Sequence, residues 1–85
     1  MNLSWSNNAW EDYLYWHDTD KNLFKRVNAL IKDIKRHPFD GLGDTEPLRQ
    51  QWSGYWSRRI NKEHRLVYSV KEEKEIFIAK CRYHY

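Results

Sequence analysis

The chain has 85 residues and a mass of 10.5 kDa, with a formal net charge of +3 and a sequence pI of about 9.1. This length predicts one compact domain spanning residues 1–85 and excludes a large multidomain enzyme. The lone Cys81 excludes an internal disulfide framework and no apolar run is long enough to span a membrane, so we expect a cytoplasmic protein without a membrane partner.

The charges are distributed unevenly along the chain. The first 20 residues hold four acidic side chains and no lysine or arginine, whereas residues 49–85 hold nine basic and four acidic ones. Much of the excess is arginine, whose planar guanidinium binds phosphate better than an ammonium group does. The basic half therefore favours a phosphate-containing partner, although a solvated sheet face has the same composition. The aromatic residues, 16% of the chain, leave a similar choice between core packing and base stacking.

A short strand and a first helix are predicted at the start of the chain. Alternation over residues 2–5 indicates the strand, and Ser6 is a suitable N-cap for the helix that follows. Trp10, Tyr13 and Leu14 would share its apolar face, which predicts that these residues contribute to the core.

A second helix has the clearest periodicity in the sequence. It begins at the pair Thr19–Asp20, and Pro38 ends it at about His37. Its apolar residues form a single stripe, which makes this helix the main partner of the core. The stripe consists of Leu23, Phe24, Val27, Leu30, Ile31 and Ile34.

The second half of the chain predicts an irregular loop and then an antiparallel meander. Glycines and Pro47 interrupt residues 39–53, whereas residues 55–60, 64–70 and 75–81 have the length and composition of strands. The polar turns between them are short enough for consecutive hairpins. Two helices followed by such strands predict an α+β fold.

Four places in this scheme carry side chains suited to chemistry. Glu46 lies in the long loop, where an acidic residue is usually just solvated. Arg65 follows a hairpin turn and would pair with Ile60 or with Arg59, depending on a register that the sequence leaves open. His84 is penultimate, in a tail whose aromatic residues indicate packing rather than fraying. Cys81 is interpreted as a buried strand residue.

No metal site and no other cofactor is predicted. The four histidines are scattered, no cysteine pair has ligand spacing, and no glycine-rich loop precedes a helix. A carboxylate, a histidine and several arginines remain. Cleavage of RNA needs such groups: a base for the 2′-OH proton, an acid for the leaving oxygen, and cations for the crowded phosphorane. DNA lacks the 2′-OH and would be inert.

The sequence resembles the YoeB toxins of the RelE/ParE superfamily over its whole length. The segments that carry the resemblance are Trp10-Glu11-Asp12-Tyr13-Leu14-Tyr15-Trp16, Leu30-Ile31-Lys32-Asp33-Ile34, Pro38-Phe39, Glu46-Pro47-Leu48, Ser53-Gly54-Tyr55-Trp56-Ser57-Arg58-Arg59-Ile60, Glu63-His64-Arg65-Leu66-Val67-Tyr68 and Cys81-Arg82-Tyr83-His84-Tyr85. The resemblance implies a microbial-ribonuclease-like fold, in which two N-terminal helices pack on a twisted, mostly antiparallel sheet. It also implies a homodimeric toxin that cuts mRNA in the ribosomal A site and is neutralised by a YefM-like antitoxin.

Residue roles follow from the same resemblance. It implies Glu46 as general base, His84 as general acid, and Arg65 as the group that holds the scissile phosphate, with Tyr85 orienting the site. Glu63 would support Arg65. Further contacts to RNA or phosphate are expected from Arg49, Arg58 and Arg59.

Two other functions stay open at this point. A ParE-like relative would keep the fold and inhibit DNA gyrase by binding alone, because a fold does not fix an activity. A plain RNA-binding module would bind RNA in a salt-dependent manner and generate no new ends.

Overall fold

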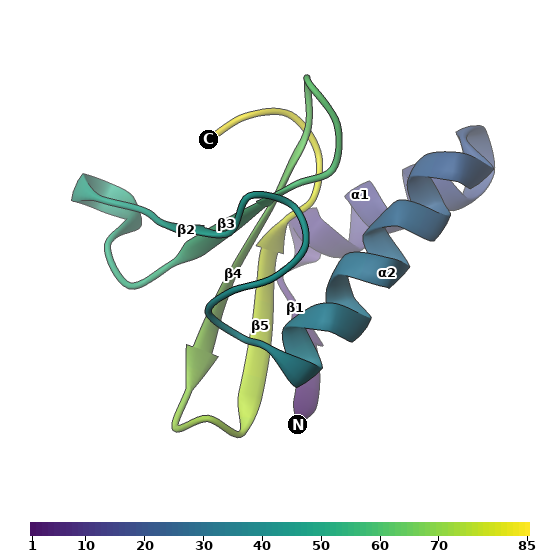
Figure 1. The fold of residues 1–85 in the computed structure, drawn as a ribbon. Coiled ribbons are helices and arrows are strands. Elements are labelled where there is room, and N and C mark those ends of the chain that lie inside the picture. Colours follow the sequence, from purple (N-terminus) through teal and green to yellow (C-terminus); the bar gives the residue numbers. More distant parts are fainter.

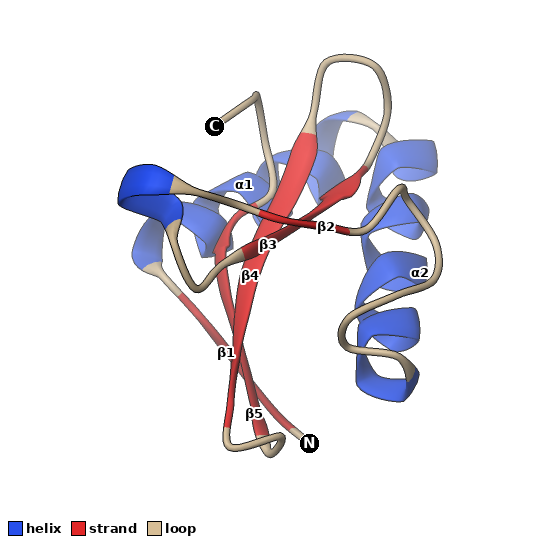
Figure 2. Ribbon diagram, turned by 60° about the vertical axis from the view of Figure 1, so that its left-hand side comes forward, coloured by secondary structure: helices blue, strands red, loops and turns tan.

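The computed structural model describes all residues from 1 to 85 as two helices on a five-stranded sheet. The elements are β1 (Asn2–Trp5), α1 (Asn7–Thr19), α2 (Lys21–Arg36), β2 (Glu46–Pro47), a 3-10 helix (Gln50–Trp52), β3 (Trp56–Arg59), β4 (Arg65–Lys71) and β5 (Glu75–Lys80). The sheet order is β1-β5-β4-β3-β2, with β1 parallel to β5 and the other pairs antiparallel. The predicted α+β class and mostly antiparallel sheet are confirmed, and both helices lie on one side of the sheet (Figures 1 and 2).

Side chains at the predicted positions cap both helices. Ser6 Oγ accepts the amide hydrogen of Ala9 at 2.9 Å, which satisfies a free donor in the first turn of α1. Asp20 ends α1 and caps α2, because its carboxylate accepts from the backbone amides of Asn22 and Leu23. His37 follows the last turn of α2, as the proline after it predicts.

The core lies between α2, α1 and the sheet. Four residues of the predicted α2 stripe are buried, namely Val27, Leu30, Ile31 and Ile34. They pack with apolar residues of β4 and β5, such as Leu66, Ile76 and Ile78. No helix of the structure is long and apolar enough to cross a membrane.

The predicted buried face of α1 is only partly right, because Tyr13 packs against the core whereas Trp10 and Leu14 do not. Ala9, Asp12 and Trp16 point inward, whereas Trp10 remains 45% exposed and Leu14 is also exposed. Trp10 instead belongs to a surface group of aromatic rings, within 5.6 Å of the ring centroids of Trp5 and Tyr13. Ala9, the smallest apolar side chain of the helix, is fully buried, and its carbonyl lies 3.6 Å from Cys81 Sγ.

Strand pairing settles the register that the sequence left open. Arg65 lies directly opposite Arg59, not opposite Ile60. The loop expected between α2 and the hairpins also contains structure, because Glu46 and Pro47 pair with Ser57 and Trp56 to form the edge of the sheet. This short edge strand holds Glu46 at a defined position.

Candidate active site

Glu46, Arg59 and Arg65 lie on the same side of the sheet, the one that carries no helix. Directly paired residues share a face, and Glu46 pairs with Ser57 while Arg59 pairs with Arg65. Ser57 and Arg59 are two residues apart on β3, so both pairs point the same way. The intervening Arg58 points to α2 and marks the opposite side. We call the helix-free side the open face.

The C-terminal segment, residues 81–85, returns to this face after β5. Figure 1 shows it curving past the β3–β4 turn toward β2. At its end, the Tyr85 hydroxyl donates to Glu46 Oε1 at 2.9 Å. The structure thus brings together the proposed base and the residues beside His84, although 39 positions separate Tyr85 from Glu46 in the sequence.

Contacts with α1 and with the β3–β4 turn fix the path of the segment. Asp12 accepts the amide hydrogen of Cys81 at 3.1 Å, and Trp16 Nε1 donates to the Cys81 carbonyl at 2.8 Å. Two residues later, the Tyr83 amide donates to His64 Nδ1 at 2.8 Å, and its carbonyl accepts from the Arg65 amide at 3.0 Å. The segment is therefore anchored at two points before it reaches His84.

The side chain of Arg65 is held at one end and free at the other. Its Nη1 donates to the carbonyls of Asn61, Lys62 and His64 at 2.7–3.3 Å. No ion pair involves Arg65, and all of its side-chain hydrogen bonds use Nη1. Its Nε and Nη2 make no hydrogen bond within the protein.

Arg59 adds a second cation opposite Arg65. It is exposed, and its nearest acidic neighbour is Asp44 at 3.8 Å. Like charges directly across a strand pair are unfavourable, so the pairing of Arg59 with Arg65 carries a cost within the protein. Arg49 and Glu63 are also exposed, and no hydrogen bond or ion pair joins the Glu63 side chain to Arg65.

His84 and the two tyrosines beside it are more exposed than the sequence predicts. Tyr83 is 58% exposed and Tyr85 45%, so the expectation that the last residues are packed is wrong for their side chains. The backbone is nevertheless held, because Lys80 Nζ donates to the His84 carbonyl at 2.6 Å. The centroids of the His84 and Tyr85 rings lie 5.9 Å apart. His84 is thus presented to solvent on a fixed backbone.

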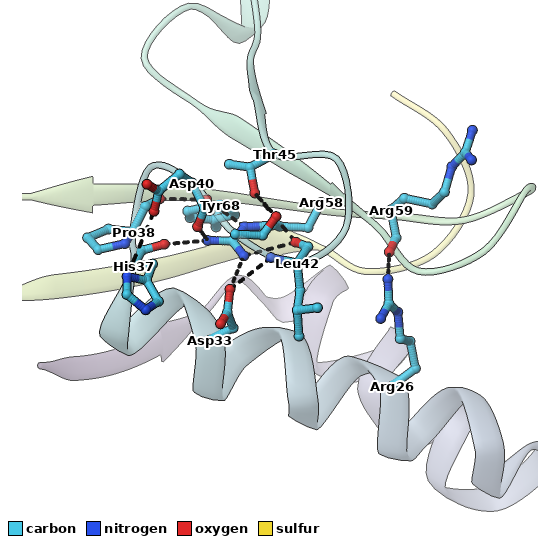
Figure 3. A network of polar contacts seen from close by, with 11 residues as sticks. Arg26, Asp33, His37, Pro38, Asp40, Leu42, Thr45, Arg58, Arg59 and Tyr68 are labelled. Carbon is cyan, nitrogen blue, oxygen red and sulfur yellow. Dashed lines mark hydrogen bonds and ion pairs between the residues drawn. The ribbon is translucent and has the colours of Figure 1, made fainter.

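The prediction that Arg58 binds RNA is wrong, because its guanidinium is fully buried. All five of its N–H groups have partners: Nε donates to the Tyr68 hydroxyl at 3.1 Å, and Nη1 donates to Asp33 at 2.7 Å. The remaining donors bind the carbonyls of Leu42, His37 and Asp40. Figure 3 shows Arg58 enclosed between α2 and the loop that follows it, whereas the Arg59 side chain points away.

The ion pair between Arg58 and Asp33 is built into the turn after α2. The hydrogen bond from Arg58 holds the pKa of the Asp33 carboxyl below its usual range, and the Leu42 amide adds to this effect. Gly41 lies against the same carboxylate at a φ of +113°, and a Cβ there would overlap Asp33 Oδ2. The loop can therefore close over Arg58 only with glycine at this position.

Sequence reasoning missed His64, Asp12 and Trp16, which position the C-terminal segment. Burial raises the pKa of Asp12, whose carboxylate receives the Cys81 amide, and burial lowers the pKa of His64. A polar residue at an inward-facing helical position is the signal that would have identified Asp12. No local pattern distinguishes His64, because its partner is distant in the sequence.

Cys81 is expected to be inert in the folded protein. It is fully buried, its Sγ lies 3.6 Å from the Ala9 carbonyl, and burial raises the pKa of its thiol. Only the thiolate reacts readily, so a thiol-modifying reagent at pH 8 should label unfolded protein quickly and native protein slowly. Labelling of both forms at the same rate, followed by mass spectrometry, would contradict this prediction.

The surface pockets of the protein lie away from the candidate site. None of them is lined by Glu46, Arg65 or His84. The largest, about 550 Å³, lies between α1 and the start of the C-terminal segment, beside Tyr15 and Arg82. The candidate site is thus an open surface rather than a cleft that encloses a substrate.

Comparison with known proteins gives consistent relatives over the whole chain. A family model described as "YoeB-like toxin of bacterial type II toxin-antitoxin system" matches residues 5–85. Toxin YoeB of Escherichia coli strain K12 is 56% identical over 85 residues, which cover all of both proteins. The solved structure of the YoeB/ParE toxin from Agrobacterium tumefaciens has a TM-score of 0.97 at 45% identity and covers all of both chains.

YoeB from Staphylococcus aureus is a further structural relative, solved in two states. The structure of its dimer matches this chain with a TM-score of 0.92, and the structure of its heterotetrameric complex with YefM matches with a TM-score of 0.91. Both are 46% identical to this chain and cover 100% of it and 98% of the other chain. From these matches, the chain belongs to the YoeB-like toxin family of bacterial type II toxin–antitoxin systems.

Proposed function

We propose that this toxin is an endoribonuclease that cleaves mRNA in the A site of the ribosome. The observation that carries the proposal is the meeting of the C-terminal segment with β2, where the Tyr85 hydroxyl bonds to Glu46. The proposal is supported by Glu46 and the Arg59–Arg65 pair on the same face of the sheet, with the segment that carries His84 ending against Glu46. Those groups match the needs of 2′-OH transesterification.

In this mechanism the substrate supplies its own nucleophile. Glu46 removes the proton of the ribose 2′-OH, whose oxygen attacks the adjacent phosphorus. Arg65, with Arg59 opposite, stabilises the charge of the five-coordinate phosphorane through its free Nε and Nη2. His84 gives a proton to the departing 5′-oxygen, which leaves a 2′,3′-cyclic phosphate and a 5′-hydroxyl. Tyr85 orients Glu46 by donating to one of its two oxygens.

The shape of the site supports dependence on the ribosome. Because no hollow contains the proposed catalytic residues, the protein alone does little to orient a flexible RNA strand. Orientation of the reacting groups can contribute an effective molarity of ~10⁵ M or more. Another macromolecule that holds the RNA must then provide this orientation. A ribosome that holds the codon in place would provide it, and the exposed Arg49 is available for contact with that RNA.

The relatives also support proposals about partners. We expect a YefM-like antitoxin to bind and neutralise this chain, and the free toxin to form a homodimer, as the Staphylococcus aureus structures do. Size-exclusion chromatography with light scattering, applied to the toxin alone and after co-expression with a YefM-like antitoxin, tests both. Elution of the toxin as a monomer that does not bind the antitoxin would contradict both proposals.

Primer extension on translated mRNA tests the activity. Wild-type toxin should produce new ends, and Glu46→Gln should cleave ~10²-fold more slowly, since this is the lower end of general-base effects. The lower end applies because water can partly replace an exposed carboxylate as base. Glu11→Gln, on an exposed face of α1, is the matched control and should cleave like wild type.

The chemistry of the new ends separates the mechanisms. The proposal requires a 2′,3′-cyclic phosphate or the 3′-phosphate derived from it, and a 2′-deoxy substitution at the cleaved position should abolish the reaction. Fragments ending in a 3′-hydroxyl would refute the 2′-OH mechanism. Absence of new ends, together with reduced supercoiling by gyrase, would favour a ParE-like inhibitor.

A further inference from the structure

A sharp turn at Tyr83 directs the end of the chain back onto the open face. Tyr83 has a φ of +63°, a left-handed conformation that is unfavourable for an aromatic residue. Such a residue keeps this conformation only where its surroundings hold it there. The turn matters because His84 and Tyr85 follow it directly, and the Tyr85 hydroxyl reaches Glu46.

Two consecutive residues hold the Tyr83 backbone from both sides. The Arg65 amide donates to the Tyr83 carbonyl at 3.0 Å, which continues the pairing of β4 beyond β5. The Tyr83 amide donates to Nδ1 of His64 at 2.8 Å. The second bond is the unusual one, because a side chain rather than a strand accepts the hydrogen.

His64 is itself fixed in position. Its backbone amide donates to Asn61 Oδ1 at 2.9 Å, and its carbonyl accepts from the amide of Ile60 at 3.0 Å. Its ring packs against that of Trp16 in a T-shaped arrangement, with a centroid distance of 4.7 Å and an interplanar angle of 71°. Trp16 is 4% exposed and bonds to the Cys81 carbonyl, so the imidazole rests on a rigid support.

The lowered pKa of the ring favours the protonation state that this bond requires. Nδ1 accepts a hydrogen bond only in the neutral ring, with the proton on Nε2. Burial lowers the pKa of His64, and the positive charge of Arg82 acts in the same direction, against the opposing effects of Glu63 and Asp12. At neutral pH the lone pair of Nδ1 is therefore available.

From these contacts we infer that His64 is a positioning residue of the toxin: its Nδ1 holds the Tyr83 turn and thereby places His84 and Tyr85 at the reacting phosphate. The inference rests on the proposed ribonuclease function for its catalytic consequence, whereas the anchoring of the turn stands independently of it.

Two substitutions distinguish the role of the Nδ1 acceptor from that of the aromatic ring. His64→Phe keeps an aromatic ring against Trp16 and removes the acceptor. His64→Asn loses the ring but carries Oδ1 at the same number of bonds from the backbone as Nδ1. We expect His64→Phe to lower kcat on programmed ribosomes roughly 10- to 100-fold with KM unchanged, the scale of misplacing a catalytic group by about 1 Å. His64→Asn should stay within about threefold of wild type, because the hydrogen bond to the Tyr83 amide is kept.

Amide NMR spectra of the full-length toxin give a readout that needs no catalysis. In His64→Phe the amide signals of Tyr83, His84 and Tyr85 should shift and exchange with solvent faster, while signals from α2 stay in place. Unchanged signals from the three tail residues would overturn the inference, as would equal losses of kcat in both variants. If wild-type toxin cleaves no mRNA, the proposed function fails, and the NMR comparison still decides whether His64 anchors the turn.

Discussion

Replacing His84 with glutamine is expected to slow mRNA cleavage on ribosomes by between ~10² and 10⁴-fold, the range for loss of a general acid or base. Glutamine can donate a hydrogen bond to the leaving 5′-oxygen but cannot transfer a proton to it. Histidine does both near neutral pH. The measurement is a single-turnover time course on ribosomes programmed with a defined message, so that product release does not limit the observed rate.

The structure offers a matched control for this substitution. His17 is an exposed histidine near the end of α1, where its Nδ1 lies 3.0 Å from Asp18. His17→Gln makes the same chemical change away from the open face and should cleave at the wild-type rate. Because His84 is also exposed, thermal unfolding of His84→Gln should match that of wild type. Cleavage by His84→Gln at the wild-type rate would remove the residue from the mechanism.

The fold could be predicted from sequence where a pattern is local. The stripe on α2, the caps Ser6 and Asp20, and the polar turns between strands all depend on neighbours within a few positions. The sequence places Tyr13 of α1 correctly against the core but Trp10 and Leu14 wrongly, because large side chains outweigh small Ala9 in any judgement by hydrophobicity. The small residue is the buried one, because its backbone packs against Cys81 after β5 and leaves no room for a large side chain.

The site was harder to predict, because it depends on strand register and on contacts between distant segments. Arg58 and Arg59 are adjacent and chemically identical, yet a strand sends one into the core and the other to the open face. Which one points inward depends on which face α2 covers. His64 escapes prediction for a related reason, since only the return of the C-terminal segment gives its Nδ1 a partner, Tyr83.

The contrast between the two arginines leads to the second large effect. Arg58→Met should lower the free energy of unfolding by about 3–5 kcal/mol, the usual cost of breaking a buried ion pair by removing one partner. The loss extends beyond the pair, because the carbonyls of Leu42, His37 and Asp40 lose their donors with it. The free energy of unfolding of a native protein is only ~5–15 kcal/mol in total, so much of the variant is expected to unfold in mild denaturant. Urea titration followed by tryptophan fluorescence measures the change.

Arg59→Met is the matched control and should show the opposite pattern. Its side chain is exposed and its contact with Asp44 is 3.8 Å long, so the free energy of unfolding should change by no more than about 0.5 kcal/mol. Cleavage of mRNA should fall instead, because a cation is lost beside the scissile phosphate. Equal stability losses in the two variants would contradict the assignment of Arg58 to the core and Arg59 to the open face.

The pH dependence of unfolding gives an independent check on the Arg58 pair. Because the pKa of Asp33 is lower in the folded protein than in the unfolded chain, the unfolded chain binds more protons as the pH falls. The stability that Asp33 contributes is therefore complete above its unfolded pKa of about 3.9 and is lost as the pH falls through the depressed folded value. Arg58→Met removes the main cause of the lowered Asp33 pKa. Between pH 5 and pH 2 the free energy of unfolding of the variant should therefore fall less than that of wild type, by about the contribution of one carboxyl group. Parallel acid curves for the two proteins would mean that Asp33 is held by the loop amide of Leu42 rather than by Arg58.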